Sequence, residues 1–587
     1  IENEKGAWLA YRLHIPGRPT AELLPEVVER ALAALPVPKR MRWGSGEVEF
    51  VRPVHWVCLL QGSEVIEATV LGIAAGDRTR GHRFHHPGPL KLAEPAAYAP
   101  LLETEGRVLP SFAERREAIR AQLLDAAARL GGTVRIDEDL LDEVTALVEW
   151  PVAITGNFEP RFLEVPHEAL ILTMQDNQKY FPVVDEAGRL LPHFITIANI
   201  ESREPERVRE GNERVIRPRF ADAEFFWNQD RRRPLASHLP ELEQVVFQKQ
   251  LGTLADKTRR LMRLAGELAA MLQVDEAQAR RAAELSKCDL MTSMVYEFPE
   301  LQGIMGRYYA AHDGEPGEVP QALEEQYLPR HAGDALPQTG VGRVLALADR
   351  LDTLLGIFAI GQKPSGNRDP FGLRRAALGI LRILLEGRLP LDLERLLGLA
   401  AEALREQVEV SEAAIAEAFD FCIERLRSLY LEQGITPQVF EAVRAVRPTA
   451  PLDFDRRVHA VAAFARLPEA EALAAANKRI GNILRKAREA GEAIPEAVDG
   501  DLLREEAERA LALEVDRVAN AVAPLFDEGE YQAALERLAE LRPVVDRFFD
   551  EVMVMAEDAA LRRNRLALLR RLQGLFLAVA DIAQLQV

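Results

Sequence analysis

The sequence predicts a multidomain protein, with an N-terminal α+β region followed by mostly α-helical domains. Three observations lead to this fold class. The chain has 587 residues, which corresponds to about four domains at roughly 150 residues each. Apolar and β-branched runs bounded by turn residues are found in the first part of the chain. From about Leu235 onward, Leu, Ala, Arg and Glu instead recur with a helical period.

In the N-terminal region, residues 1–235, we expect two β-hairpins with helices between them. The candidate strands are residues 55–60, 65–73, 180–184 and 193–200. A turn at Gly62 separates the first pair, and a turn at Gly188 separates the second. Residues 110–130 carry apolar side chains at helical spacing, so a helix should cover the sheet. The aromatic run at 225–227 is expected in the core, because packed aromatic rings need no ligand.

The rest of the chain divides where Pro, Gly, Asn and Asp cluster. These breaks are residues 312–320, 362–370, 447–451 and 491–500. We interpret the third break as a domain boundary. The sequence therefore predicts a helical domain at 236–390, a helical linker at 391–446 and a last helical domain at 447–587.

The charge balance limits the possible partners. The chain has 73 Lys and Arg against 92 Asp and Glu, a net charge of -19. Such a chain repels polyanions as a whole and cannot coat nucleic acid non-specifically. With 48% hydrophobic and 28% charged residues, the composition is that of a globular protein rather than a disordered one. An RNA partner would therefore need local basic patches, and DNA is not expected.

The cysteines and the apolar runs indicate the compartment. Cys58, Cys288 and Cys422 are the only cysteines in the sequence, far apart and without a CxxC pair. This spacing argues against a disulfide framework and against structural zinc. No apolar run approaches the roughly 18 residues that a membrane span needs. We therefore expect a cytoplasmic protein.

A histidine-rich segment leaves two interpretations. His82 and His86 could bind a transition metal. However, Arg80 and Arg83 lie close to these histidines in the sequence, and their charges would repel a cation while attracting a phosphate. We favour a basic loop, with a solvated turn as the plain alternative. The sequence has no GxxxxGK[ST] loop, so nothing else in it indicates a nucleotide phosphate cradle.

Two helical segments resemble the pattern of HD phosphohydrolases. Asp289 follows Cys288, and Asp349 lies three residues before Asp352 on one face of an expected helix. The resemblance implies a helical domain in which two histidines and two aspartates gather a divalent metal. Cys288 stands where the paired histidine belongs, and no convincing first histidine precedes it. Asp289 and Asp349 alone make a poor metal site, so a scaffold without catalytic metal is favoured. A metal-dependent HD-type phosphohydrolase is the alternative function.

Longer segments resemble one family much more specifically. They are residues 173–182, 211–226, 247–253, 286–306, 346–380, 476–484 and 548–569, which read TMQDNQKYFP, GNERVIRPRFADAEFF, FQKQLGT, SKCDLMTSMVYEFPELQGIMG, ALADRLDTLLGIFAIGQKPSGNRDPFGLRRAALGI, ANKRIGNIL and FFDEVMVMAEDAALRRNRLALL. Together they resemble the beta subunit of bacterial heterotetrameric glycyl-tRNA synthetase, and they span nearly the whole chain.

This resemblance implies a division of labour between two subunits. The alpha subunit carries the class II core that activates glycine with ATP and Mg2+, and the beta subunit captures tRNA(Gly). We therefore expect a tRNA-binding subunit of a glycine-tRNA ligase that binds no cofactor itself and is inactive without the alpha subunit. Two alpha and two beta subunits are expected to assemble. Family members have further residues before the point where this chain begins, so the N-terminal region is expected to be truncated at its start.

The last domain resembles the helical anticodon-binding domain of arginyl-tRNA synthetases. An apolar stripe on one of its expected helices is formed by Ile480, Ile483, Leu484 and Ala487. The residues expected to contact tRNA from the other face are Lys478, Arg479, Asn482, Arg485 and Lys486. The amide of Asn482 offers a donor and an acceptor to an unstacked base, and the cations suit phosphates. The alternative is a solvated amphipathic helix.

Further arginine clusters are candidate RNA contacts. The second cluster in the last domain consists of Arg562, Arg563, Asn564, Arg565 and Arg570. Arginine suits RNA because its planar guanidinium bridges phosphates and stacks on bases, although some members are expected to pair with Glu557 or Asp558. Elsewhere the candidates are Arg80, Arg83, Arg217, Arg219, Arg368, Arg374 and Arg375. Neighbouring Pro, Gly and aromatic residues could hold loops rigidly against RNA there.

Overall fold

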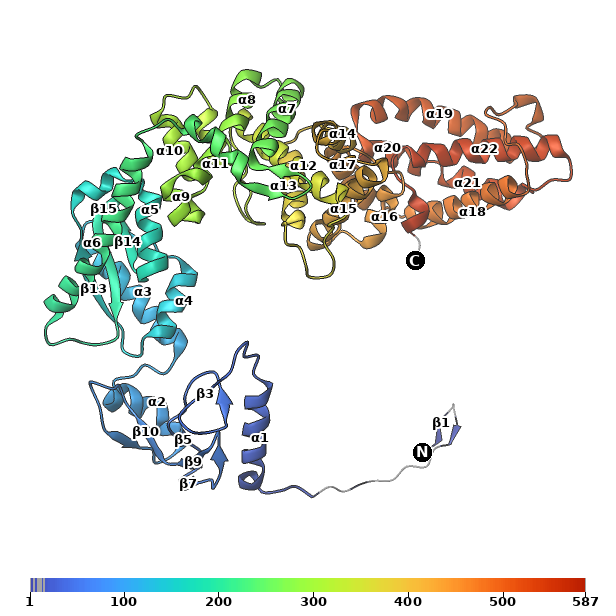
Figure 1. The fold of residues 1–587 in the computed structure, drawn as a ribbon. Helices are drawn as coiled ribbons and strands as arrows, with labels where there is room; N and C mark the ends of the chain where they lie inside the picture. The colour runs from blue at the N-terminus through green and yellow to red at the C-terminus, as the bar shows by residue number, and fades with distance from the viewer. Residues whose placement is uncertain (1, 4–5, 8–12, 14–15, 586–587) are drawn as a thin grey trace. The chain divides into compact units, whose positions relative to one another are not determined.

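The computed structural model describes residues 2–3, 6–7, 13 and 16–585. The chain divides into two compact units, Ile1–Asn228 and Gln229–Val587, and the division falls within helix α6 (Pro205–Asp230). Strands and helices alternate in the first unit, whereas helices dominate the second (Figure 1). The predicted fold class, an α+β region followed by helical domains, is confirmed.

The first part of unit 1 consists of helix α1 (Thr20–Ala34) and very short strands. The strands are β1 (Glu2–Asn3), β2 (Gly6–Ala7), β3 (Met41–Arg42), β4 (Glu49–Phe50), β5 (Val57–Cys58), β6 (Leu60–Gln61), β7 (Glu64–Val65), β8 (Thr69–Val70), β9 (Ile73–Gly76), β10 (Arg78–Arg80) and β11 (Pro89–Lys91). Strands β6 and β7 pair antiparallel around Gly62, whose φ of 59° suits glycine. A hairpin therefore forms at the first predicted turn, but it is limited to these two-residue strands, and β5 instead pairs parallel with β9.

The second part of unit 1 is a four-stranded antiparallel sheet with helices on it. The strands, in spatial order, are β12 (Thr133–Val134), β14 (Phe181–Val184), β15 (Leu190–Ala198) and β13 (Val152–Asn157). Strands β14 and β15 form the second predicted hairpin, with Gly188 in its turn at a φ of 78°. Helices α2 (Tyr98–Leu101) and α5 (His167–Leu172) complete this part.

Two helices of unit 1 pack on its four-stranded sheet and form a hydrophobic core with it. Helix α3 (Phe112–Arg129) is the helix expected at 110–130, and α4 (Glu138–Leu147) packs beside it. Each begins with a side-chain cap: Ser111 accepts from the backbone of Glu114, and Asp137 accepts from that of Leu140. Their apolar faces meet the sheet in a core of Ile119, Leu123, Leu141, Phe181 and Ile195.

Helix α6 corrects two expectations. The basic stretch that includes Arg217 and Arg219 was expected in a loop, but it lies within this 26-residue helix, which accommodates Pro218. Phe225 was expected in the core, but its side chain is 60% exposed, whereas Trp227 is buried at 7%. Helical periodicity explains the difference, because residues two apart face different sides of a helix.

The first helices of unit 2 surround a buried helix. They are α7 (Leu254–Leu272), α8 (Glu276–Leu285), α9 (Ser293–Glu297), α10 (Ile304–His312), α11 (Val319–Glu325), α12 (Gly340–Ala359) and α13 (Leu373–Glu386). Helix α12 is buried over most of its length and packs against α7, α8, α11 and α13. Because neighbouring helices cover α12 on several sides, the core of these helices lies around it.

A small hairpin interrupts the expected run of helices. Strands β16 (Val246–Gln248) and β17 (Gly252–Thr253) pair antiparallel just before α7. The expectation that strands end near Leu235 is wrong for this segment. Strands of two or three residues are too short to show an alternating pattern, and only Gly252, with its φ of 83°, marks the turn.

The remaining helices of unit 2 run to the end of the chain. They are α14 (Leu393–Leu404), α15 (Glu412–Glu432), α16 (Pro437–Arg444), α17 (Pro451–Phe464), α18 (Ala470–Glu489), α19 (Glu506–Glu528), α20 (Tyr531–Ala539), α21 (Arg542–Glu551) and α22 (Ala559–Leu577). The four expected breaks all fall where one helix ends and the next begins. The domain limits at 236, 391 and 447 stay predictions. Among the described residues, no helix is both long and apolar enough to cross a membrane.

Candidate functional site: basic helix faces and a core filled by cations

Helix α18 presents the amphipathic pattern that its sequence predicts. Ile480, Leu484 and Ala487 are buried, and Ile483 is half-buried. Helices α21 and α22 pack on this side of it, and all three lie along one another in Figure 1. The basic face of α18, which we define as Lys478, Arg479, Asn482, Arg485 and Lys486, is exposed. The helix therefore brings together all five residues expected from its sequence.

The side chains of the basic face of α18 make different contacts with the rest of the protein. The guanidinium of Arg479 lies 4.3 Å from the centroid of the Phe549 ring, which orients it by a cation–π contact. Arg485 donates to the Glu489 carboxylate at 3.1 Å and to Oδ1 of Asn482 at 3.4 Å. Lys478 and its neighbours therefore offer cations to phosphate, and Asn482 is exposed between them.

The arginine cluster on α22 is mostly committed to the protein itself. Asn564 is 3% exposed, and its side chain bonds the backbone N–H and C=O of Asp499 at 2.7 and 2.9 Å. Arg565 is 7% exposed and forms an ion pair with the buried Glu508. These two side chains are almost fully buried and bind other groups of the chain, so they are poorly placed to contact RNA.

The other members of the α22 cluster reach the surface to different degrees. Arg563 is exposed. Arg562 pairs with Glu492 at 2.8 Å, and Arg570 is half-buried with a long hydrogen bond to the carbonyl of Ile494 at 3.4 Å. Arginine pairing with Glu557 was expected, and Arg562 does donate to Glu557, but to its backbone carbonyl. The Asp558 side chain caps α22 instead of pairing with an arginine. Arg563 is therefore the most available cation of the cluster.

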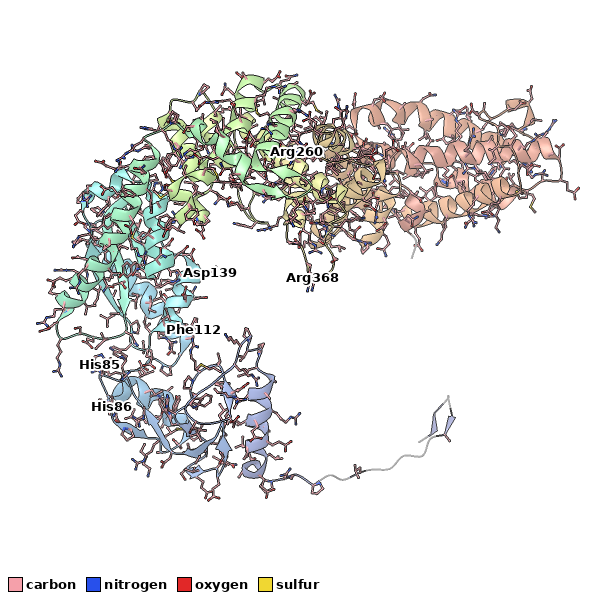
Figure 2. All side chains as sticks on the ribbon, in the orientation of Figure 1. His85, His86, Phe112, Asp139, Arg260 and Arg368 are labelled. Carbon is pink, nitrogen blue, oxygen red and sulfur yellow. The ribbon has the colours of Figure 1, made fainter. Side chains whose placement is uncertain are left out.

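In unit 1, a histidine supports the loop that carries Arg80 and Arg83. His82 is 2% exposed; its Nε2 donates to the carbonyl of Asn199 at 2.8 Å, and its Nδ1 accepts from the backbone of Phe84 and His85 at 3.3 Å. Both ring nitrogens are thus occupied, so His82 cannot serve as the metal ligand that one interpretation required. Figure 2 shows His85 and His86 on the same segment.

The arginines of this loop are exposed beside aromatic rings. The guanidinium of Arg80 lies 5.9 Å from the ring centroid of Trp56, and that of Arg83 lies 5.9 Å from the ring centroid of Phe84. Exposed arginines next to exposed rings suit phosphates and unstacked bases. The geometry fits the favoured interpretation, a basic loop, whose contact with RNA stays a prediction.

The remaining candidate arginines lie on separate elements. On α6, Arg217 pairs with Glu159 at 2.6 Å, and Arg219 is exposed. Arg368 lies in the turn between α12 and α13, where its backbone pairs with Ser365, and Figure 2 shows it on this loop. Arg374 donates to the carbonyl of Gly366, while Arg375 lies in the first turn of α13 and is exposed.

The two degenerate HD positions lie in the middle of the helices around α12, among cations. The carboxylate of Asp349 forms ion pairs with Lys257 at 3.2 Å and with Lys287 at 3.0 Å. The neighbouring Asp352 is fully buried and binds Lys257 at 3.0 Å and Arg260 at 2.5 Å. We call these five residues the cation-filled core; Figure 2 labels Arg260 in it.

The acids of this region differ in their proton affinity. Burial raises the pKa of Asp349, but Lys257 and Lys287 more than reverse this and hold the pKa below its usual range. For Asp289 burial dominates: it raises the pKa to about 6, although the backbone N–H of Gly303 and the charge of Lys287 both act to lower it. Burial also raises the pKa of the Cys288 thiol to about 12, so this residue is a protonated thiol. Asp349 is therefore firmly an anion, whereas Asp289 keeps its proton to a higher pH.

The residues present do not fit a divalent metal. A metal site needs several oxygen or imidazole ligands with room for the ion, but two ammonium groups already contact Asp349. In the described part of the chain, no group of three or more His, Cys, Asp or Glu side chains could hold a metal ion. The arrangement is a structural charge cluster, and it gives the HD-type phosphohydrolase alternative no support.

Sequence reasoning missed the cations of this core. Lys257, Arg260 and Lys287 are only 3%, 1% and 5% exposed. A signal was present in the sequence, because all three lie on apolar faces of expected helices, where an unpaired charge would be very costly. Their acidic partners lie 62 to 95 residues further along the chain, so no local pattern connects them.

Comparison with known proteins gives two matching family models. The model described as glycyl-tRNA synthetase beta subunit matches residues 1–445, and the model described as DALR anticodon binding domain matches residues 473–580. The second match includes both the basic face of α18 and the cluster on α22.

Similar relatives cover this chain from end to end. Proteins named glycine-tRNA ligase beta subunit from Marinobacter nauticus and Chromohalobacter salexigens are each 55% identical to it over 586 residues. The protein of that name from Hahella chejuensis is 53% identical over 587 residues. Each alignment includes 100% of this chain and 84% of the relative.

Proposed function

The chain belongs to the family of glycyl-tRNA synthetase beta subunits, and from that premise we propose how its surfaces serve the attachment of glycine to tRNA(Gly). In this proposal it is the tRNA-binding subunit of the ligase. The observation that carries the proposal is the exposed basic face of α18 within the DALR anticodon binding match. An otherwise acidic chain binds RNA selectively when its cations are concentrated on such faces.

The anticodon is the proposed target of this face. Unpaired loop bases can be read by hydrogen bonds to their edges, and Asn482 is the residue that offers such bonds between cations. Lys478, Arg479 and Lys486 would then contact the flanking phosphates, with Arg479 oriented by Phe549. Arg563 extends this surface on α22, whereas Asn564 and Arg565 are left out because they are buried.

The proposal leaves the chemistry to the alpha subunit. We propose that ATP and Mg2+ are used there and that this chain binds neither. The cation-filled core supports this view, because its lysines neutralise the acids that a divalent ion would need. We further propose that two alpha and two beta subunits assemble, and that they act in the cytoplasm, where translation uses the product.

Aminoacylation assays test the proposal. Glycyl-tRNA(Gly) formation should be substantial with both subunits and negligible with this chain alone. Robust product from this chain alone, or no gain when it is added to the alpha subunit, would contradict the proposed roles. A tRNA with an altered anticodon gives a matched control, since it should bind this chain more weakly while keeping the same total phosphate charge.

A further inference from the structure

A cavity in unit 2 is separate from the basic face of α18 and from the arginine cluster on α22. It is lined from α12, from the start of α13 and from the segment after α11, and α12 packs against both other helices (Figure 1). Its volume is ≈ 520 Å³, within the roughly 300–1,000 Å³ of small-molecule sites in proteins. The cavity is thus large enough for a ligand of the size of a mononucleotide.

The charged groups on the floor of this cavity are held by ion pairs and hydrogen bonds within the protein. Asp349 is held by Lys257 and Lys287. The guanidinium of Arg350 donates to four backbone carbonyls at 2.8 to 3.2 Å, those of Gln326, Ala346, Tyr327 and Pro329. Rearranging these groups would leave buried polar atoms without partners, which is costly. The floor is therefore a fixed surface, and a ligand must be recognised mainly from the rim.

The rim carries two available guanidinium groups. Arg330 and Arg375 both line the cavity and are exposed. Within the described residues, neither guanidinium has a carboxylate within ion-pair distance. The exposed acid on the lining is Glu300, so the basic groups of the rim outnumber the acidic one. Guanidinium groups bind phosphate oxygens in bidentate fashion, so the rim favours a phosphate.

Gly372 allows Arg375 to lie across the start of α13. Its φ of 64° is in the left-handed region, and a Cβ built there would be 3.1 Å from Nη2 of Arg375. A larger residue would strain the backbone and displace the guanidinium. The glycine therefore helps to keep this cation beside the cavity.

Aromatic rings complete the lining. Phe371 and Tyr327 are both half-buried at the cavity wall. Bases stack on such rings with little preference for sequence. A bare phosphate would use neither ring and would fill only a small part of the space, whereas a nucleotide would use the cations and the rings together.

We propose that this cavity binds a nucleoside phosphate, with its phosphoryl group between Arg330 and Arg375 and its base against Phe371. No bond is made or broken there. The ligand can be a free mononucleotide or an unpaired nucleotide of a bound RNA, because both present the same chemistry. The proposal goes beyond the function proposed above, and its failure would leave the aminoacylation test unaffected.

Titration calorimetry of the full chain tests this site with four probes. They are adenosine 5′-monophosphate, adenosine, inorganic phosphate and a single-stranded RNA tetranucleotide without a terminal phosphate monoester. The monophosphate or the tetranucleotide should bind more tightly than inorganic phosphate. Tighter binding of the monophosphate assigns the site to free nucleotides, and tighter binding of the tetranucleotide assigns it to RNA.

Matched variants separate this site from non-specific attraction. The double variant Arg330→Gln/Arg375→Gln should bind the preferred probe at least tenfold more weakly. The control Arg395→Gln alters one exposed arginine outside the cavity, on α14, and should leave affinity unchanged. Phe371→Leu should weaken the nucleotide but not inorganic phosphate. Circular dichroism is expected to show intact helices in all variants, since both rim arginines are exposed.

Three outcomes would overturn the proposal. They are equal affinity of the double variant and the unmodified chain, no preference for either nucleotide probe over inorganic phosphate, and no measurable binding of either nucleotide. Should the double variant lose its helices, Arg375→Lys provides a second comparison. It keeps the charge but removes the bidentate geometry, so it should still weaken the preferred probe, and unchanged affinity would again overturn the proposal.

Discussion

Lys257 on α7 and Lys478 on α18 are both lysines of long helices in unit 2, yet one is buried among carboxylates and the other is exposed. Lys257 is 3% exposed and lies between the carboxylates of Asp349 and Asp352. Lys478 is exposed on the basic face of α18. The first neutralises acids of its own chain, and the second is available to a polyanion. The role of a basic residue therefore depends on which acids the fold brings to it, not on its helix.

The same contrast occurs within two residues of α22. Arg563 is exposed, whereas Arg565 is buried against Glu508. The run of arginines is uniform in sequence, but the helix turns each side chain to a different environment. Within a cluster of basic residues, the buried members that pair with acids of the chain should therefore be set apart from the exposed members, and only the exposed ones are candidates for RNA binding.

The largest effect should come from breaking the cation-filled core. Asp352→Ala leaves Lys257 and Arg260 buried without their shared carboxylate. Removing one partner of a buried ion pair costs about 3–5 kcal/mol, so urea denaturation should show that much loss in the free energy of unfolding. The control Glu386→Ala removes an exposed partner of Arg382 and should cost less than about 1 kcal/mol. Equal costs for the two variants would show that the core is not structural.

The second-largest effect is on the pH dependence of stability, in which Asp289 and Asp349 should act in opposite directions. Because the folded pKa of Asp289 is raised from 3.8 to about 6, its contribution to stability is full below pH 3.8 and is lost as the pH rises through 6. The loss amounts to about 3 kcal/mol. Asp349 has a lowered pKa, so its contribution is lost in the other direction, as the pH falls below 3.8.

Urea denaturation at several pH values between 4 and 7.5 measures this effect. Asp289→Asn cannot ionise, so the free energy of unfolding of the unmodified chain should fall relative to that of the variant as the pH rises. A constant difference between the two proteins across this range would contradict the raised pKa.

A smaller effect is expected on RNA binding. Lys478→Ala/Arg479→Ala should weaken tRNA(Gly) binding about tenfold and reduce the slope of log affinity against log salt by about 2. Fluorescence anisotropy at several salt concentrations measures both. Arg537→Ala, which removes an exposed arginine that pairs with Glu540, is the control in the same domain. If the control and the double variant had the same effect, the basic face of α18 would not be the binding surface.

The smallest effect is expected at Arg485. It pairs with Glu489 at the surface, where both side chains are about 60% exposed. Such pairs contribute about 0.5 kcal/mol or less, so Arg485→Ala should hardly change thermal unfolding of the domain. A measurable loss of tRNA affinity without a loss of stability would place Arg485 in the binding part of the face. A large loss of stability would place it with Lys257 instead.

Sequence reasoning succeeded where the signal is local. The apolar side of α18, with Ile480, Leu484 and Ala487, follows from helical spacing alone. The hairpin of β14 and β15 follows from two apolar runs around Gly188. Five residues expected on one face of α18 are on one face because 3.6 residues make a turn.

It failed where partners come from far along the chain. Nothing near Arg565 in sequence reveals Glu508, which is 57 residues away. The same holds for Lys257, whose partner Asp352 is 95 residues away. The loop expected around Arg217 failed for another reason: Gly211 and Pro218 usually end helices, but packing of Ile216 and Phe220 keeps α6 continuous.

The buried thiol beside Asp289 has a chemical consequence of its own. Thiolates, not thiols, react with oxidants and alkylating reagents. Cys288 and Cys422 are fully buried, and burial raises the pKa of each to about 12. Only Cys58, which is half-buried, is within reach of a reagent. A maleimide dye should therefore label unit 1 at a single position and leave unit 2 unlabelled, so these 587 residues allow one probe to be attached without any substitution.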